Sequence, residues 1–578
     1  MTALDFSYST LHEKYGNGIP CPSDFSFPSH VLDAWSAKQP QAEALHWVSP
    51  DFSKEKIVTY RELTDLSNRA AIAFEKSGLK KGDKVMVQLP RVNEWYIVLF
   101  GLMRLGAIPV PGTSLLVAKD LKFRANACGA VAFVGDAEST SRFEEIAKEV
   151  NVSKIWQVRV DNDSGLGRGR KDFQAAVSAV AEGEKWKGPA HSSSDLALLY
   201  FTSGTTGDPK MVLLESEYTL GHTLTGSWYQ LGPGKLFLNM ADLGWAKAAY
   251  STFGNFNLGG TLFVQPPPAG NFNPTQLLEA LHRFPVTSLC APPTIYRTLV
   301  TSASLKYIKT HPFKALEHCV SAGEPLNPSV IAEWRKATDL TIKDAWGQSE
   351  TVIMVGNFQG EEVREGSMGK LAPHVIVAVI DSNGKELPDG EEGELAVRVD
   401  VGGGSRWIFK GYIKNGKVDK RQKTHGGKTW YCTGDRGIRD RDGYFWFVGR
   451  DDDVITTSGY RVGPFEVESA LKAHPAVLES AAVGSPDAAR GEIVKAFVKL
   501  SEEYRVKYAG SSKEQLDELI LELQTFFKSY TAPYKVPREF EFVESLPSTI
   551  SGKIRRVELR NLEYKRKAHI VKQLKSKL

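Results

Sequence analysis

Apolar runs and helical periodicity alternate along roughly the first 370 residues of the chain. Residues 84–89 form a short apolar run that predicts a strand, and residues 94–105 have the spacing of a helix that follows it. Residues 196–201 are almost continuously apolar, which is typical of a strand buried on both faces of a parallel sheet. The alternation predicts an α/β fold with a core of parallel sheets.

Beyond Pro373 the pattern changes to short strands separated by turns. Residues 375–380 and 394–399 predict strands, and residues 381–384 have turn chemistry. After the charged run at 449–453, the pattern predicts strands at 480–483, 493–500 and 539–543 and helices from Pro464 onward and at 515–527. We therefore expect a large domain at 1–449, rich in strands from about 374 to 449, and a small α+β domain at 452–578.

Composition narrows the class of protein. The 578 residues are 42% hydrophobic and 24% charged, which is the composition of a globular protein. The longest apolar stretch, 95–103, is far shorter than the ~20 residues of a membrane span, so no span is expected. A net charge of +4 does not point to nucleic acid. The five cysteines are scattered, which argues against a disulfide framework and a structural zinc site.

Charge is uneven along the chain. The residues from Lys535 to the end carry a net charge of +7, which leaves −3 for the rest. A solvated basic face and a docking site for a polyanionic ligand both explain this distribution, and charge alone does not choose between them.

The two ends of the chain predict a location. The first residues lack the basic and apolar regions of a secretory signal, and Asp5 and Glu13 argue against a mitochondrial transit peptide. The last three residues, Ser576-Lys577-Leu578, match the peroxisomal signal. In a eukaryote the sequence therefore predicts the peroxisome, with the peroxisomal import receptor as a partner. In a prokaryote it predicts the cytoplasm.

A segment rich in glycine and hydroxyl groups has the composition of a phosphate-binding loop. It consists of Thr202, Ser203, Gly204, Thr205, Thr206, Gly207, Asp208, Pro209 and Lys210. Glycines let backbone N–H groups turn toward an anion, hydroxyls add donors, and the lysine adds a charge. A plain surface turn is the alternative, but six consecutive Ser, Thr and Gly residues between two apolar runs argue against it.

This loop and the motifs that follow it resemble the adenylate-forming enzymes, which include acyl- and aryl-CoA synthetases, peptide-synthetase adenylation domains and luciferases. The motifs lie in family order at 202–210, 321–326, 344–351, 431–435, 449–463 and 548–556. Segments 458–468 and 531–538 look most like medium-chain acyl-CoA synthetases. The resemblance implies that ATP and a carboxylate form acyl-AMP and pyrophosphate, that coenzyme A then displaces AMP, and that Mg²⁺ is required.

The resemblance also implies which residues bind ATP. The loop at 202–210 would hold the β- and γ-phosphates, Ser349 the α-phosphate, Glu350 the Mg²⁺ ion, and Asp435 with Arg450 the ribose. The residues expected along the adenine are Gly323, Glu324, Pro325, Asp344, Ala345, Trp346, Gly347 and Gln348. Residue chemistry agrees, since a carboxylate suits both Mg²⁺ and ribose hydroxyls. An acid at a helix start (Glu350) and a turn aspartate (Asp435) are the alternatives.

Other positions are assigned by the same resemblance. Lys553 would bridge the acyl carboxylate and the α-phosphate, acting with Lys210, Ser349 and Arg461 in catalysis, and Asp452 would be the hinge of a mobile small domain. The coenzyme A face is expected at Ser458, Gly459, Tyr460, Arg490 and Lys535. The acyl pocket is expected near Trp228, Trp245, Lys247 and Tyr250. Ordinary core aromatics and solvent-facing lysines are the alternatives for these positions.

The leading hypothesis is an AMP-forming acyl-CoA synthetase for a short- or medium-chain fatty acid. An aryl-CoA ligase on the same fold is the second hypothesis. A nucleotide-binding protein without turnover would need a damaged motif, whereas Lys210, Glu350, Asp435 and Lys553 are all present. A peptide-synthetase module is disfavoured because no carrier-protein segment follows Arg560. The sequence leaves the exact acid and the oligomeric state open.

Overall fold

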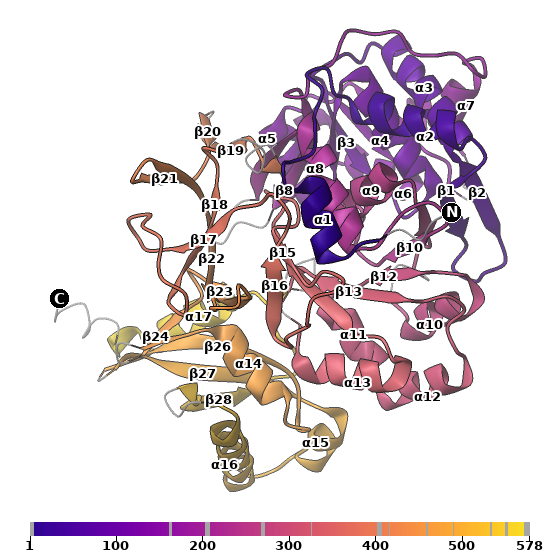
Figure 1. The fold of residues 1–578 in the computed structure, drawn as a ribbon. Coiled ribbons are helices and arrows are strands. Elements are labelled where there is room, and N and C mark those ends of the chain that lie inside the picture. Colours follow the sequence, from indigo (N-terminus) through magenta and orange to yellow (C-terminus); the bar gives the residue numbers. More distant parts are fainter. Residues whose placement is uncertain are drawn as a thin grey trace. The chain divides into compact units, whose positions relative to one another are not determined.

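The structure, a computed structural model, describes most of the chain in two compact units (Figure 1). The described residues are 5–160, 165–202, 209–267, 272–324, 326–401, 407–414, 417–457, 460–488, 490–531, 535–548 and 553–570. Unit 1 comprises Met1–Leu326, Val330–Ile376 and Arg398–Gln422, and unit 2 comprises Asn327–Ser329, Val377–Val397 and Lys423–Leu578. The domain boundary expected at 449–452 stays a prediction.

Unit 1 contains a five-stranded parallel sheet in the order β4-β3-β5-β6-β7. Its strands are β3 (Lys84–Gln88), β4 (Ile108–Pro111), β5 (Ala132–Gly135), β6 (Lys154–Gln157) and β7 (Lys171–Asp172). Helix α4 (Asn93–Leu105) follows β3, which confirms the predicted strand and helix, and packs on α3 (Tyr60–Lys76). Gly101 permits this approach, because a Cβ there would lie 2.6 Å from the Cβ of Ala70.

A second sheet of unit 1 has the order β16-β15-β14-β13-β12-β10-β11-β1-β2. Its strands are β1 (Glu43–Val48), β2 (Glu55–Thr59), β10 (Leu236–Asn239), β11 (Thr261–Val264), β12 (Ser288–Cys290), β13 (His318–Ala322), β14 (Ile342–Trp346), β15 (Val355–Gly356) and β16 (Ser367–Leu371). The neighbouring strands from β1 to β14 in this order pair parallel, whereas β15 pairs antiparallel with both β14 and β16. The motifs at 321–326 and 344–351 therefore begin at the carboxyl ends of β13 and β14, where ligands bind in such sheets.

The third sheet of unit 1, β20-β19-β9-β8, corrects one prediction. Its strands are β8 (Leu196–Thr202), β9 (Lys210–Glu215), β19 (Gly411–Lys414) and β20 (Lys417–Asp419), and all pair antiparallel. The strand predicted at 196–201 is present and buried, but its expected parallel pairing is wrong. A continuous apolar run reports that both faces are covered and says nothing of strand direction.

Unit 2 contains two sheets. The first, β17-β18-β22-β23 with β21 on β22, has strands β17 (Val377–Ile380), β18 (Glu392–Arg398), β21 (Gln422–His425), β22 (Lys428–Arg439) and β23 (Phe445–Arg450). The second, β25-β24-β27-β26 with β28 on β27, has strands β24 (Ile455–Thr457), β25 (Tyr460–Val462), β26 (Val477–Asp487), β27 (Gly491–Leu500) and β28 (Glu539–Phe542). The short strands and the α+β pattern expected beyond Pro373 are confirmed.

Helices cover these sheets. Those of unit 2 are α14 (Pro464–Lys472), α15 (Glu502–Lys507), α16 (Lys513–Tyr530) and α17 (Arg556–Arg566). The remaining helices are α1 (Tyr8–Tyr15), η1 (Pro28–Leu32), α2 (Asp33–Lys38), α5 (Ala118–Cys128), α6 (Ala137–Glu144), η2 (Ala147–Glu149), α7 (Phe173–Ser178), α8 (Ser216–Trp228), α9 (Lys247–Leu258), α10 (Pro274–Arg283), α11 (Pro293–Leu299), α12 (Ser302–Thr310) and α13 (Pro328–Thr338). Within the described ranges, no helix has the length and apolar character needed to cross a membrane.

Candidate active site

The β8–β9 hairpin holds the two ends of the predicted phosphate loop. Thr202 and Lys210 are directly opposite each other across the antiparallel ladder, so the loop leaves and re-enters the sheet at one point. Residues 203–208 lie outside the described residues, and their predicted phosphate contacts stay predictions. Lys210 is half-buried, and its Nζ lies 5.4 Å from the centre of the Tyr412 ring.

Glu350 is a buried carboxylate in the same unit. It lies in a turn after β14 and not at the start of a helix, contrary to the alternative considered from sequence. Its side chain accepts a hydrogen bond of 2.5 Å from the Tyr412 hydroxyl, and its carbonyl accepts one of 2.7 Å from the N–H of Phe409. Carboxylate oxygens held in this way fit the hard-oxygen coordination that Mg²⁺ prefers.

The sequence did not predict Tyr412 as a residue of this site. In the sequence it is one aromatic residue in a short strand, and only the pairing of β19 with β9 places it beside Lys210.

Two further tyrosines hold the turn that carries Ser349 and Glu350. Tyr250 of α9 donates to the carbonyls of Gln348 and Thr351, both at 2.7 Å, and Tyr218 of α8 donates to the carbonyl of Thr351 at 3.2 Å. Both rings are buried. Tyr250, expected in the acyl pocket, therefore supports the turn, and its role in binding the acid stays a prediction.

Asp344 lies at the predicted adenine site. Its carboxylate accepts a hydrogen bond of 2.8 Å from the N–H of Ala345. Burial raises the pKa of Asp344 to about 7, against an ordinary value of 3.8. A carboxyl group with this pKa is partly protonated near neutral pH and can then donate a hydrogen bond.

The other residues expected in the acyl pocket have different surroundings. Trp228 is buried and donates from Nε1 to the carbonyl of Asn357 at 3.2 Å, as a core tryptophan does. Trp245 is half-buried. Lys247 donates from Nζ to the carbonyl of Ala322 at 3.2 Å, at the carboxyl end of β13. Gly323 follows there with φ of +97°, and a Cβ at this glycine would lie 2.9 Å from that Nζ.

In unit 2 the two residues expected to bind the ribose lie side by side. Asp435 is opposite Arg450 in the β22–β23 ladder, and the Arg450 Nε is 3.1 Å from the Asp435 Oδ1. Asp435 is 5% exposed and belongs to the long strand β22, so it is not the turn aspartate considered as an alternative. The Arg450 side chain is more exposed to solvent than the Asp435 carboxylate, so a ligand can reach the arginine from solvent.

Lys553 emerges from a closed loop. Ser548 and Ile554 form an antiparallel bridge, and the N–H of Arg555 donates to the carbonyl of Pro547 at 2.8 Å. Lys553 itself is exposed, and residues 549–552 lie outside the described residues.

An ion pair between a half-buried arginine and a buried glutamate follows this loop directly. Arg556, at the start of α17, makes two hydrogen bonds of 2.8 and 2.7 Å to the carboxylate of Glu468 in α14. Glu468 is 1% exposed and also accepts from the N–H of Ala482 at 3.0 Å. The pair anchors α17 three residues beyond Lys553.

The predicted hinge and coenzyme A positions are only partly described. Asp452 is exposed, and its carbonyl accepts a hydrogen bond from Arg560. Ser458 and Gly459 lie outside the described residues, and the structure describes only the backbone of Tyr460 and Arg461, in β25.

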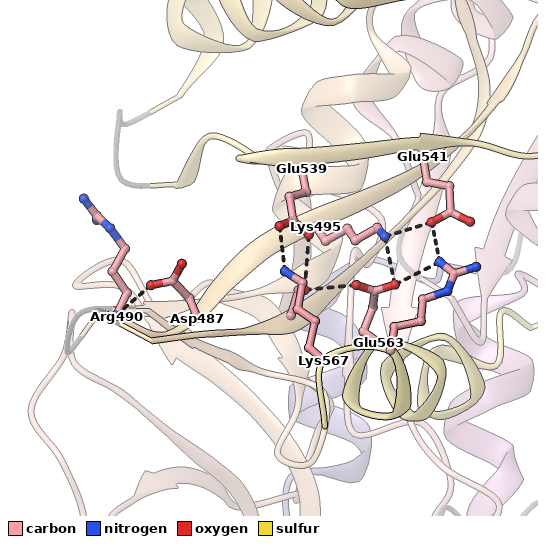
Figure 2. A network of polar contacts seen from close by, with 9 residues as sticks. Asp487, Arg490, Lys495, Glu539, Glu541, Glu563 and Lys567 are labelled. Atoms are coloured by element: carbon pink, nitrogen blue, oxygen red, sulfur yellow. Dashed lines mark hydrogen bonds and ion pairs between the residues drawn. The ribbon is translucent and has the colours of Figure 1, made fainter. Parts of the chain in front are cut away.

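Arg490 and Lys535 have nearby carboxylates. The N–H of Arg490 donates to Asp487 at 2.9 Å, while its guanidinium points away from the neighbouring network of ion pairs (Figure 2). The Nζ of Lys535 lies 2.5 Å from Glu466.

The network in Figure 2 includes Arg566 and Lys567 of the basic C-terminal stretch. Lys495 contacts Glu563 and Glu541, both at 2.8 Å, and Glu563 is 1% exposed. Arg566 contacts Glu541 and Lys567 contacts Glu539, each at 2.6 Å. These contacts tie α17 and the residue that follows it to β27 and β28.

Comparisons with known proteins cover nearly the whole chain. The family model described as AMP-binding enzyme matches residues 32–413, and the model of the AMP-binding enzyme C-terminal domain matches residues 466–553. A crystal structure of the anthranilate CoA ligase AuaEII with anthranoyl-AMP is 27% identical, with a TM-score of 0.81 over 95% of this chain and 99% of that one. A Brucella canis acyl-CoA synthetase is 33% identical, with a TM-score of 0.71 over 98% and 100%.

The curated relatives correct the predicted location. Human mitochondrial acyl-coenzyme A synthetase ACSM4 is 42% identical, over 94% of this chain and 92% of its own length. Human mitochondrial acyl-coenzyme A synthetase ACSM3 is 39% identical, over 98% and 94%. Because such relatives are mitochondrial, the peroxisomal prediction from Ser576-Lys577-Leu578 is wrong, and the expected import receptor has no support. The chain belongs to the adenylate-forming AMP-binding enzymes and, among them, to the medium-chain acyl-CoA synthetase family.

Proposed function

We propose that this AMP-forming acid–thiol ligase joins a short- or medium-chain carboxylic acid to coenzyme A. Members of this family use ATP, Mg²⁺ and coenzyme A. One observation in the structure carries the proposal: Lys210 lies over the ring of Tyr412, and the buried Glu350 accepts a hydrogen bond from the hydroxyl of the same side chain. A cation beside a held carboxylate is the arrangement that a nucleotide phosphate with its divalent cation requires.

In the first half-reaction two anions, the acid and ATP, must meet. Lys210 and the N–H groups of its loop would bind the β- and γ-phosphates, and Ser349 the α-phosphate. Bound Mg²⁺ would neutralise phosphate charge, with Glu350 as its protein ligand. Lys553 would place its ammonium between the attacking carboxylate and the α-phosphate, where negative charge is crowded.

In the second half-reaction the thiol of coenzyme A displaces AMP from the acyl group. We place the nucleotide face of coenzyme A at Arg490, an exposed arginine of unit 2 at a position where the family resemblance expects that face. The similarity to human ACSM3 and ACSM4 supports an acyl substrate, while the similarity to the anthranilate CoA ligase favours an aryl acid as the second candidate.

The test is acid-dependent release of pyrophosphate in the presence of coenzyme A. Straight-chain acids from C2 to C12, branched acids and aromatic acids would be compared at equal concentration. We expect the highest kcat/KM with a straight-chain acid. A Lys553→Ala protein is the control, in which acid-dependent release should be slower by ~10²–10³. A maximum with an aromatic acid would select the aryl-CoA ligase, and no release with any acid would refute the proposal.

A further inference from the structure

The side chain of Tyr412 lies between the two charged groups of the candidate phosphate site. Its hydroxyl donates to Glu350 Oε1 at 2.5 Å, and its ring lies 5.4 Å from Lys210 Nζ. Tyr412 is 8% exposed and Glu350 is 7% exposed, so solvent screens the contact between them little. One residue thus contacts both the cation expected to bind phosphate and the carboxylate expected to bind the metal.

Strand pairing explains the contact with Lys210. Tyr412 in β19 is directly opposite Val212 in β9, and Lys210 comes two residues before Val212 on the same face of the strand. Diagonal neighbours of this kind lie within reach of aromatic and long side chains. The position of the ammonium is therefore set by the register of the sheet.

The segment that leads into β19 also holds the backbone of Glu350. The N–H of Phe409 donates to the Glu350 carbonyl at 2.7 Å, and Thr351 forms an antiparallel bridge with Ile408. The Phe409 ring packs on Tyr412, with 4.7 Å between ring centres. Backbone and side-chain contacts together fix where the carboxylate lies relative to β9.

We propose that Tyr412 is a positioning residue that orients the Glu350 carboxylate toward a divalent cation and Lys210 toward the nucleotide phosphates. The inference rests on the proposed function for the identity of the ligand, ATP with Mg²⁺. Hydrogen bonds to a ligating carboxylate limit its rotation, and losing such a partner lowers metal affinity ~10- to 100-fold. An ammonium over an aromatic ring gains less, equivalent to about two- to fivefold in affinity.

Two substitutions separate these contributions. Tyr412→Phe removes the hydroxyl and keeps the ring, whereas Tyr412→Leu removes both. Electron paramagnetic resonance would give the dissociation constant of Mn²⁺·ATP, and calorimetry in EDTA would give that of metal-free ATP. We expect Tyr412→Phe to raise the Mn²⁺·ATP constant ~10-fold without changing the metal-free constant. Tyr412→Leu should raise the metal-free constant as well, by about two- to fivefold.

Matched controls separate positioning from general loss of stability. Tyr60→Phe removes another buried hydroxyl of unit 1, which donates to the carbonyl of Gly260 at 2.8 Å. It should lower Tm without changing Mn²⁺·ATP binding. In a Glu350→Gln protein, adding Tyr412→Phe should cause no further loss of Mn²⁺·ATP affinity, because the oriented carboxylate is already absent.

The inference is overturned if Tyr412→Phe binds Mn²⁺·ATP within twofold of the unchanged protein. It is also overturned if Tyr412→Phe weakens Mn²⁺·ATP and metal-free ATP equally, since that pattern indicates general damage. A protein that releases no pyrophosphate with any acid refutes the proposed function, yet its binding constants still decide the role of Tyr412.

Discussion

Lys553 is the residue on which the two half-reactions differ most. Its ammonium is needed while a carboxylate attacks the α-phosphate, but not when a thiol attacks the acyl group. Lys553→Ala should slow adenylate formation by ~10²–10³ and leave thioester formation from supplied acyl-AMP nearly unchanged. Single-turnover measurement of each half-reaction checks this. An equal fall in both rates would contradict the assigned role, and no fall in either would make Lys553 an ordinary exposed lysine.

Asp344 makes stability depend on pH. The folded protein holds the proton of this carboxyl up to a pKa of about 7, whereas the unfolded chain releases it near 3.8. Between these two pKa values the folded state binds more protons at Asp344 than the unfolded state does. The contribution of Asp344 to the free energy of unfolding therefore falls as pH rises from about 4 to 7. Asp344→Asn should remove this fall, which denaturant unfolding at several pH values would measure. Parallel stability curves for the two proteins would contradict the prediction.

The contact between Arg556 and Glu468 joins helix α17 to helix α14 directly after the loop that carries Lys553. Lysine keeps the positive charge but cannot reproduce the two parallel hydrogen bonds of arginine, and a hydrogen bond to a charged group contributes about 1.5–3 kcal/mol. Arg556→Lys should therefore lower the free energy of unfolding by about 1.5–3 kcal/mol and slow adenylate formation more than thioester formation. Arg555→Lys is the matched control, because its pair with Glu558 is exposed and should contribute under 1 kcal/mol. Equal effects of both substitutions would contradict the anchoring role.

Helices and strands with a clear pattern of apolar residues were predictable from the sequence. Contacts that depend on which strands pair, and in which register, were not. Helix α4 and strands β3 and β27 follow from local pattern, since each contains a run of mostly apolar residues that the fold buries, and β28 follows from its alternation of Glu and Phe. The antiparallel direction of β8 and the position of Tyr412 depend on which strands pair, which no local pattern encodes. For the same reason the Arg450–Asp435 contact could be expected only from the family resemblance.

At the scale of the whole molecule, ion pairs and a hydrophobic core stabilise the C-terminal region. Its basic residues were interpreted from sequence as a solvated face or an anion-binding face. Two of them, Arg566 and Lys567, pair with Glu541 and Glu539 of β28, and Glu563 of α17 pairs with Lys495 of β27 (Figure 2). These pairs link α17 to β27 and β28, so α17 is part of the fold of this unit. For the other basic residues both interpretations stay predictions.

The separate core of this region leads to a prediction about the whole chain. Val467, Leu471, Leu519, Leu523 and Phe527 are fully buried within one cluster, and every member of this cluster lies beyond residue 454. The Glu468–Arg556 and Lys495–Glu563 pairs also lie within 452–578. We therefore expect a fragment of residues 452–578 to fold alone and to unfold in one cooperative transition, measured by circular dichroism during urea titration.

A variant and a longer fragment complete this test. Glu563→Gln should shift the transition of the 452–578 fragment to lower urea, because it leaves the Lys495 ammonium, which is 10% exposed, with a weaker set of partners. Unit 2 also includes the strands β22 and β23, so a fragment of residues 423–578 is the matched comparison. A cooperative transition in the longer fragment alone would contradict the prediction, because the core beyond residue 454 would then depend on those strands for its stability.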